Sequence, residues 1–178
     1  MSRTLLVGHP KGSWRDWLKA NLGTRDLLIL DPTDADHGPA ARAVLLRDEK
    51  VVGWRLIGTI DPQRNPLGLI SAGAILSREL SEDAVILTHS VRLAPVLRQI
   101  ALAIAEIIPP TEILVPAGSR LEHESWPVGA EVVELPEGYP PLVKDAQRRA
   151  RWIELMAQSE RHEINIHDVS IQGTRLGS

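Results

Sequence analysis

The sequence predicts an α/β protein with a mainly parallel sheet flanked by helices, and three observations support this class. Short continuous apolar runs such as "LLVG", "DLLIL" and "AVILTH" recur along the chain. Such runs are typical of parallel strands that are buried on both faces. Segments with apolar residues at helical spacing alternate with these runs, and alternating strands and helices build a layered sheet with crossover connections. The 178 residues suffice for one well-buried core, so we expect a single domain.

The first half of the chain predicts the opening of this sheet. A strand is expected at 3–8, a turn at "HPKGS", and a helix at 14–22 that is closed by Gly23. The run "DLLIL" predicts a second strand. Two β-rich halves around "RDEK" at 42–58 predict a hairpin, and a helix from 67 to 80 follows the turn-rich "DPQRNPLG".

The second half continues the alternation. Strands are expected at 83–89, 111–116 and 130–136, and a long helix at 93–108 is ended by Pro109 and Pro110. An amphipathic helix is predicted at 144–158 and an alternating strand at 162–177. We expect "LLVG", "LLILD", "AVILTH" and "EILVP" to be the central strands. On the helix near the C-terminus, the residues expected to face the core are Leu142, Ala146, Ala150, Ile153 and Leu155 or Met156.

Composition excludes several classes of protein. No apolar run is long enough to span a membrane and the start lacks a secretory signal, so we expect a cytoplasmic protein without a membrane partner. The absence of cysteine rules out disulfides and thiolate metal sites. The six histidines fall in no metal-binding spacing, and we expect no metal site. "THS" has no nucleophile-elbow motif around it, which argues against a serine hydrolase.

The loop "VGHPKGSWRDWL" at 7–18 resembles a phosphate-binding loop whose key residues are replaced. The full pattern, G-x-x-x-x-G-K-[ST], places a lysine on the phosphates and a hydroxyl on magnesium. With one inserted residue, Trp14, Arg15 and Asp16 stand where glycine, lysine and serine or threonine belong. The alternative is a plain turn with Ser13 as a helix cap. Trp14 and Trp17 are three residues apart, so we expect both to pack on one face. The candidate phosphate-binding residues are Gly8, Lys11, Gly12, Ser13 and Arg15.

Segments along nearly the whole chain resemble the P-loop polynucleotide 5′-hydroxyl kinase family, the RNA kinases of tRNA splicing, RNA 3′-end processing and pre-rRNA processing. In order, they are "TLLVGHPKGSWRDWL", "LLILDPTDADHG", "GTIDPQRNPLG", "DAVILTHSVRLAP", "IIPPTEILVP", "KDAQRRARWIELM" and "INIHDVSIQGTRLG". The resemblance implies a P-loop NTPase-like three-layer fold, in which 1–178 form one kinase-like domain with a short C-terminal strand extension.

The resemblance also implies site residues. Asp31 and Asp34 would be the acids that activate a 5′-hydroxyl or face magnesium, and the alternative is that both are turn caps. Gly58, Asp61, Pro62 and Thr88 match further short family segments. The nucleic-acid-binding candidates are Arg148, Arg149 and Arg151, which match the family's arginine-rich helix; the alternative is a solvated helix face with ion pairs.

Two functions follow from these observations. The favoured one is a degenerate kinase-like domain without a cofactor, a non-catalytic binding or scaffold module for a nucleotide, RNA or protein partner. The other is an active polynucleotide or nucleoside 5′-kinase that uses ATP or GTP with magnesium, with Lys11 or Arg15 replacing the missing lysine. Replacement of the loop glycine and of the magnesium-binding hydroxyl favours the first.

Overall fold

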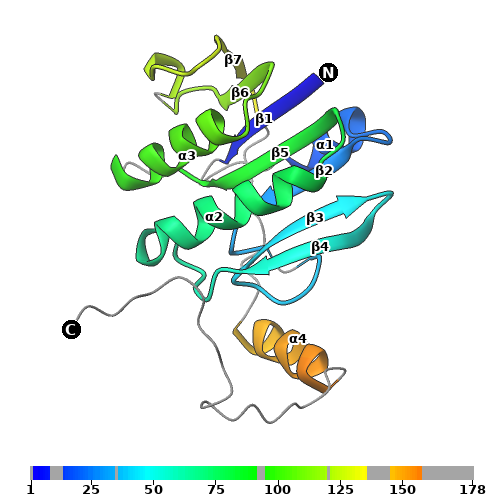
Figure 1. Cartoon of the computed structure of the whole chain (residues 1–178). Helices are drawn as coiled ribbons and strands as arrows, with labels where there is room; N and C mark the ends of the chain where they lie inside the picture. The colour runs from blue at the N-terminus through cyan, green and yellow to red at the C-terminus, as the bar shows by residue number, and fades with distance from the viewer. Residues whose placement is uncertain are drawn as a thin grey trace, which may run out of the picture.

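The computed structural model describes residues 2–8, 14–34, 36–91, 95–119, 121–135 and 145–157, and these form a seven-stranded sheet with helices (Figure 1). The strands are β1 (Ser2–Gly8), β2 (Asp26–Leu30), β3 (Arg42–Arg47), β4 (Lys50–Leu56), β5 (Asp83–Ser90), β6 (Glu112–Pro116) and β7 (Ala130–Val133). The helices are α1 (Arg15–Asn21), α2 (Pro66–Leu76), α3 (Pro95–Ile107) and α4 (Asp145–Ala157), with short 3₁₀ turns at Pro62–Arg64, Ser77–Glu79 and Leu121–His123.

The sheet order is β4-β3-β2-β5-β1-β6-β7. The strands β2, β5, β1, β6 and β7 pair in parallel, whereas β3 and β4 form an antiparallel edge. The mainly parallel α/β class is therefore confirmed. The four apolar runs predicted to be central are β2, β5, β1 and β6. Each has a neighbouring strand on either side in the sheet, which confirms the prediction.

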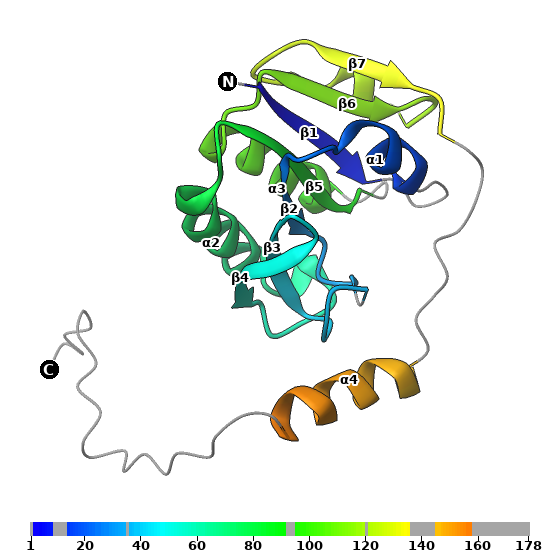
Figure 2. The ribbon, with the colours of Figure 1, turned by 90° about the vertical axis from the view of Figure 1, so that its right-hand side faces the viewer.

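Helices cover the two faces of the sheet unequally. Helices α2 and α3 pack on one face, and the 7-residue helix α1 packs on the other (Figure 2). The larger apolar cluster joins α2 and α3 to the sheet, and a smaller cluster holds Trp14, with Trp17, Leu18 and Leu22 packed against it. The predicted packing of Trp14 and Trp17 against the sheet is confirmed, and their rings meet edge to face at 6.1 Å.

The predicted hairpin is formed by β3 and β4. Its turn residues, Asp48 and Glu49, have φ angles of 48° and 60°. Two successive positive φ angles are the geometry of the tight turn that matches the twist of paired strands. The hairpin extends the sheet to its outer strand, β4.

The buried carboxylate of Asp26 fixes the start of β2. Arg47 donates two hydrogen bonds to it, from Nε at 2.9 Å and Nη2 at 2.8 Å, and the Ser81 amide donates a third at 2.8 Å. The Arg47 hydrogen bonds lower the pKa of Asp26, with the Ser81 amide adding to the effect and burial opposing it. The carboxylate therefore ties three chain segments together at the end of the sheet opposite the candidate site.

We predict that Asp26→Asn lowers stability at pH 7 and that this loss disappears as the pH falls. A carboxyl group with a lowered folded-state pKa stabilises the fold above its ordinary value of 3.8, and this contribution is lost as the pH falls below that value. Urea unfolding of both chains at pH 7 and pH 3 measures the difference. Asp83→Asn is the matched control, because Asp83 pairs with Arg25 but is largely exposed. An equal loss in both variants would contradict the prediction.

Helix α4 differs from its predicted environment. Ile153 and Met156 have 61% and 66% of their surface exposed, and Ala150 is also exposed, so the prediction that these residues face the core is wrong. Leu155 is partly buried. Leu142 and the side chain of Ala146 lie outside the described residues. In both views α4 lies beyond the β3–β4 edge of the sheet (Figures 1 and 2). The helical period defined an apolar face, but the period does not specify what that face contacts.

None of the helices in the described part of the chain is long and apolar enough to cross a membrane. The predicted terminal strand at 162–177 lies outside the described residues.

Candidate functional site

The carboxyl ends of β1, β2 and β5 meet at one edge of the sheet, which is where ligands bind in open α/β folds. Most of the predicted site residues follow these strands. Gly8 ends β1, and the acidic loop of residues 31–34 and 36–41 follows β2. Thr88 and His89 lie at the end of β5. Lys11, Gly12 and Ser13 lie outside the described residues.

Gly8 is required by a close approach between strands. A Cβ atom at this position would lie 2.5 Å from the His89 carbonyl oxygen and 2.8 Å from that of Thr88. The Gly8 amide donates to Thr88 Oγ1 at 3.1 Å, and the Val91 amide donates to the Gly8 carbonyl at 3.2 Å. Glycine therefore lets β1 and β5 close against each other at this edge.

Trp14 precedes α1 and is fixed to the sheet. Only 3% of its surface is exposed, and its indole Nε1 donates a 2.8 Å hydrogen bond to the Val7 carbonyl at the end of β1. Trp14 also occupies the N-cap position, without a side-chain hydrogen bond to the helix. The alternative with Ser13 as the helix cap stays a prediction, because Ser13 lies outside the described residues.

The first two residues of α1 carry opposite charges. Arg15 lies 3.8 Å from Asp36 across the acidic loop, and the two side chains are more than half exposed. Asp16 is exposed and lies 4.0 Å from Lys19 on the next turn. The start of the helix thus presents an arginine engaged with a carboxylate, followed by a second carboxylate.

Asp31 closes its own turn in the acidic loop. Its Oδ1 accepts hydrogen bonds from the Thr33 amide at 2.9 Å and the Thr33 hydroxyl at 2.8 Å. Burial raises the pKa of this carboxyl; the Thr33 hydrogen bonds oppose the rise, and the charge of Asp34 adds to it. These local bonds are those of a turn-capping aspartate. The raised pKa is also the shift that a general base requires.

Asp34 is paired with His37, a residue that sequence reasoning did not single out. The His37 Nδ1 atom lies 3.2 Å from Asp34 Oδ2, and this hydrogen bond raises the pKa of His37, with burial opposing it. The sequence shows only that the two residues are three positions apart in a loop. The fold of the turn brings their side chains into contact. A carboxylate that orients an imidazole is a common arrangement for proton transfer.

The acidic loop also joins elements that are distant in sequence. Arg15 of α1 reaches the side chain of Asp36, and Arg151 of α4 donates from Nη1 to the Asp36 carbonyl at 3.2 Å. The structure therefore brings Arg15, Arg151 and the Asp31–Asp34 segment to one region. Of the other predicted basic residues, Arg149 is exposed, and the side chain of Arg148 lies outside the described residues.

His89 is buried beside Gly8, with one ring nitrogen unpartnered. Its Nε2 donates to the Leu97 carbonyl at 3.2 Å, and its Nδ1 has no hydrogen-bond partner. Burial lowers its pKa to about 4, so the ring is neutral at pH 7. Thr88 is also buried, and its hydroxyl is bonded between β1 and β5. Thr88 therefore links β5 to β1, and His89 links β5 to α3.

In the described part of the chain, no three His, Asp or Glu side chains gather closely enough to hold a metal ion. Asp61 caps the 3₁₀ turn that follows it by accepting from the Gln63 amide at 3.1 Å, and Gly58 adopts a φ of 83°. These two residues therefore have local structural roles in the β4–α2 connection.

Comparison with solved structures finds a similar fold. No family model matches the chain, and no curated protein matches it. It is similar to a solved structure of Clp1p that describes an extended interface with Pcf11p and the structural basis for ATP loss in a point mutant. The TM-score is 0.52 at 13% sequence identity, and the match covers 84% of this chain. It covers 47% of the Clp1p chain, so this protein spans about half its length. The likeness shows that this chain shares its α/β fold with that part of Clp1p.

Proposed function

We propose that this chain is a P-loop kinase-like domain that does not transfer phosphate and acts as a binding or scaffold module for a protein. The observation that carries the proposal is the fixed position of Trp14 at the start of α1. In a working phosphate loop this region offers small residues and open backbone amides. Here an indole, 3% exposed and bonded to the Val7 carbonyl, occupies the position before the helix.

The charges after Trp14 support the same function. Arg15 can neutralise phosphate charge, but its guanidinium already lies 3.8 Å from Asp36. Asp16 stands where a serine or threonine hydroxyl would coordinate magnesium, and its carboxylate would repel phosphate oxygens. Binding of a nucleoside triphosphate would therefore have to break one ion pair and tolerate a neighbouring negative charge.

Helix α4 supports a protein partner. Ile153 and Met156 lie one turn apart, and Arg149 lies one turn before Ile153, so the three exposed residues share a face. An apolar helix face with basic residues fits an apolar groove with an acidic rim. The formal net charge of −3 gives no overall attraction to RNA. The likeness to Clp1p, whose structure describes an interface with Pcf11p, is consistent with this class of partner.

Thermal unfolding with Mg-ATP and Mg-GTP tests the proposal. A ligand at a hundred times its Kd stabilises a protein by about 2.7 kcal/mol. This corresponds to a shift of roughly 5 to 10 °C for a chain of this size. We expect no shift for the natural chain, and no phosphate transfer to an RNA oligonucleotide with a 5′-hydroxyl. Micromolar nucleotide binding together with phosphorylation of the RNA would establish the active kinase instead.

Two variants refine this test. Arg15→Lys combined with Asp16→Ser restores the phosphate and magnesium side chains while retaining the Trp14 packing. A gain of Mg-ATP binding in this variant would assign the loss to the two charged positions. Fluorescence anisotropy with a labelled RNA oligonucleotide tests the other partner class. Specific RNA binding that Arg149→Ala abolishes would contradict a protein partner.

A further inference from the structure

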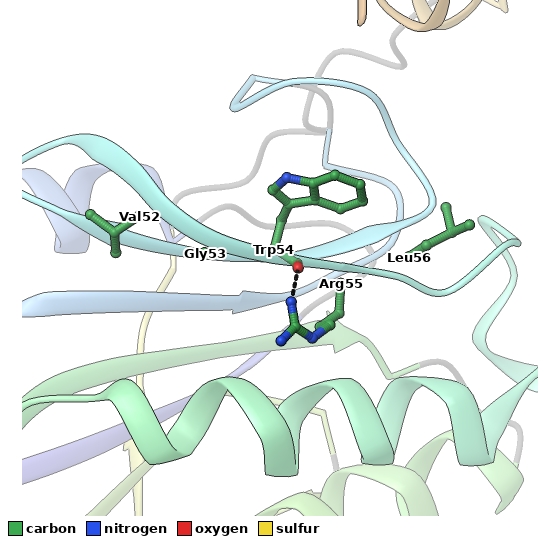
Figure 3. A pocket seen from close by; sticks show the side chains of 5 residues that line it. All are labelled: Val52, Gly53, Trp54, Arg55 and Leu56. Carbon is green, nitrogen blue, oxygen red and sulfur yellow. Dashed lines mark hydrogen bonds between the residues drawn. The ribbon is translucent and has the colours of Figure 1, made fainter. Parts of the chain in front are cut away.

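Strand β4 is the outer strand of the sheet, and its free edge carries exposed apolar side chains. No described strand pairs with the side of β4 that faces away from β3. Trp54 and Leu56 are 41% and 58% exposed and lie on one side of the strand, and Arg55 lies on the other (Figure 3). Helix α4 contacts the acidic loop through Arg151 and leaves β4 exposed. An uncovered apolar edge strand is a site for pairing with a further strand.

The side chain of Trp54 is held in one position at the middle of this edge. The Arg42 guanidinium lies 5.0 Å from the centre of its ring. Arg42 is fixed in turn, because it donates to the carbonyl oxygens of Pro39 at 2.9 Å and His37 at 3.1 Å. Residues 52–56 line a shallow hollow along the strand (Figure 3). A side chain that is already ordered loses little conformational entropy when a partner packs against it.

The other side of β4 carries two opposite charges that form no ion pair among the described residues. Arg55 and Glu79 are both exposed, and neither side chain takes part in a salt bridge there. The Arg55 guanidinium donates to the neighbouring Trp54 carbonyl at 3.0 Å. Glu79 lies beside Gly53, since a Cβ atom on this glycine would be 3.6 Å from Glu79 Oε2. A carboxylate therefore stands next to a strand position that has no side chain of its own.

The regular part of β4 is short. Leu45 of β3 pairs with Gly53 and Leu46 pairs with Val51, so Val52 is an extra, bulged residue. Residues 53–56 pair regularly with β3. A partner strand on the outer edge is therefore expected to follow residues 53–56 and to lose its regular pairing at the bulge.

We propose that β4 pairs antiparallel with β4 of a second copy of this chain, about a two-fold axis that passes Trp54. The two Trp54 side chains then lie directly opposite each other, and aromatic pairs at such positions are favourable. Arg55 lies opposite Gly53 of the second copy, at a separation of about 4.5 to 5.5 Å. Its guanidinium therefore reaches the Glu79 carboxylate that stands beside that glycine. The two-fold axis forms this ion pair twice.

Charge and the bulge favour this register over its neighbours. Pairing that keeps Trp54 on the same face in both copies permits only shifts of two residues. A shift in one direction places the two Arg55 side chains opposite each other, and like charges at directly opposite positions repel. A shift in the other direction places Trp54 opposite the bulged Val52 and interrupts the ladder at its centre. In the proposed register Val52 meets Leu56 at the end of the ladder, outside the regular pairs.

Because the chain contains no cysteine, a single introduced cysteine tests the register. We expect Trp54→Cys to form a disulfide-linked dimer under mild oxidation, because directly opposite residues have Cα atoms about 4.5 to 5.5 Å apart. Arg55→Cys is the matched control, since the two residues at position 55 lie diagonally, about 7 to 8 Å apart. Non-reducing electrophoresis of the full chain measures the dimer in both variants. Equal yields, or no disulfide in Trp54→Cys, would overturn the proposal.

Charge reversal gives a second readout that keeps Trp54. Sedimentation velocity of the full chain is expected to show a monomer–dimer equilibrium, and both Arg55→Glu and Glu79→Arg should raise its dissociation constant about tenfold or more. Combining the two substitutions in one chain should restore the dimer, because each ion pair forms again with its charges exchanged. Glu82→Arg, at another exposed carboxylate, is the matched control and should leave the constant unchanged. A monomer at every concentration, or an equal effect of Glu82→Arg, would show that β4 does not pair with a second copy in this way.

Discussion

Replacing Trp14 with alanine is expected to lower the free energy of unfolding by about 3 to 5 kcal/mol, the range for truncating a buried tryptophan. The indole is 3% exposed, packs on the sheet, and donates to the Val7 carbonyl at 2.8 Å. Both the packing and the hydrogen bond are lost together. Urea unfolding monitored by circular dichroism measures the change. The expected loss is a large fraction of the 5 to 15 kcal/mol that stabilises an ordinary domain.

Two further variants separate the contributions at this position. Trp14→Phe keeps an aromatic ring and removes the N–H, and should cost about 1 to 3 kcal/mol, the penalty for an unsatisfied buried carbonyl. Trp17→Ala removes the partly buried partner of the edge-to-face pair and should cost less than Trp14→Ala. A Trp14→Ala effect no larger than that of Trp17→Ala would contradict the role assigned to Trp14.

This expectation also affects how the phosphate loop should be restored. Trp14→Gly would bring the sequence closer to the full motif, but it would remove a buried anchor of α1 and β1. Unfolding of such a variant would then be mistaken for failure to bind nucleotide. Arg15→Lys combined with Asp16→Ser restores the two motif side chains while keeping Trp14, and so avoids this confusion.

Acid is expected to destabilise the fold through His89 at a pH where most carboxylates are still charged. Burial lowers the pKa of His89 to about 4, from an ordinary value of 6.5. The unfolded chain therefore binds a proton more readily than the folded chain, so stability is complete above pH 6.5 and is lost as the pH falls toward 4. Each pKa unit corresponds to 1.36 kcal/mol, which gives a loss of about 2 to 3 kcal/mol between pH 7 and pH 4.5.

Two histidine variants test this pH dependence. His89→Gln keeps an amide donor for the Leu97 carbonyl and should remove most of the loss between pH 7 and pH 4.5. His37 has the opposite sign, because its hydrogen bond to Asp34 raises its pKa. Its contribution is present below pH 6.5 and is lost as the pH rises through its folded-state pKa. His37→Asn should therefore leave the acid loss in place. If His89→Gln retained the full acid loss, the titrating group would be another residue.

The candidate site was only partly accessible to sequence reasoning. The loop after β1, the acidic residues after β2 and the "THS" end of β5 were all placed at one edge of a parallel sheet, and the structure has these strand ends there. The assignment of Gly8 to phosphate binding remains a prediction, but its closest contacts are the β5 backbone. That contact depends on a strand 80 residues away, which no local pattern around Gly8 encodes.

The sequence by itself determined the order and type of the elements. Apolar runs bounded by turn residues indicated the central strands, the double proline at 109–110 excludes a longer α3, and helical spacing indicated α4, whereas α2 ends at Leu76, short of the predicted residue 80. These properties are local, because they follow from backbone geometry and the burial of neighbouring side chains.

Only the tertiary structure decided which partners these elements meet. Parallel neighbours such as β1 and β5 are joined by crossovers, so their register and the contacts of Gly8 and His89 depend on packing of the whole sheet. The same holds for α4: its apolar face is plain in the sequence, yet Ile153 and Met156 are exposed because burial depends on the surfaces that the rest of the fold brings to it. Local periodicity defines a face, and the three-dimensional arrangement determines what that face contacts.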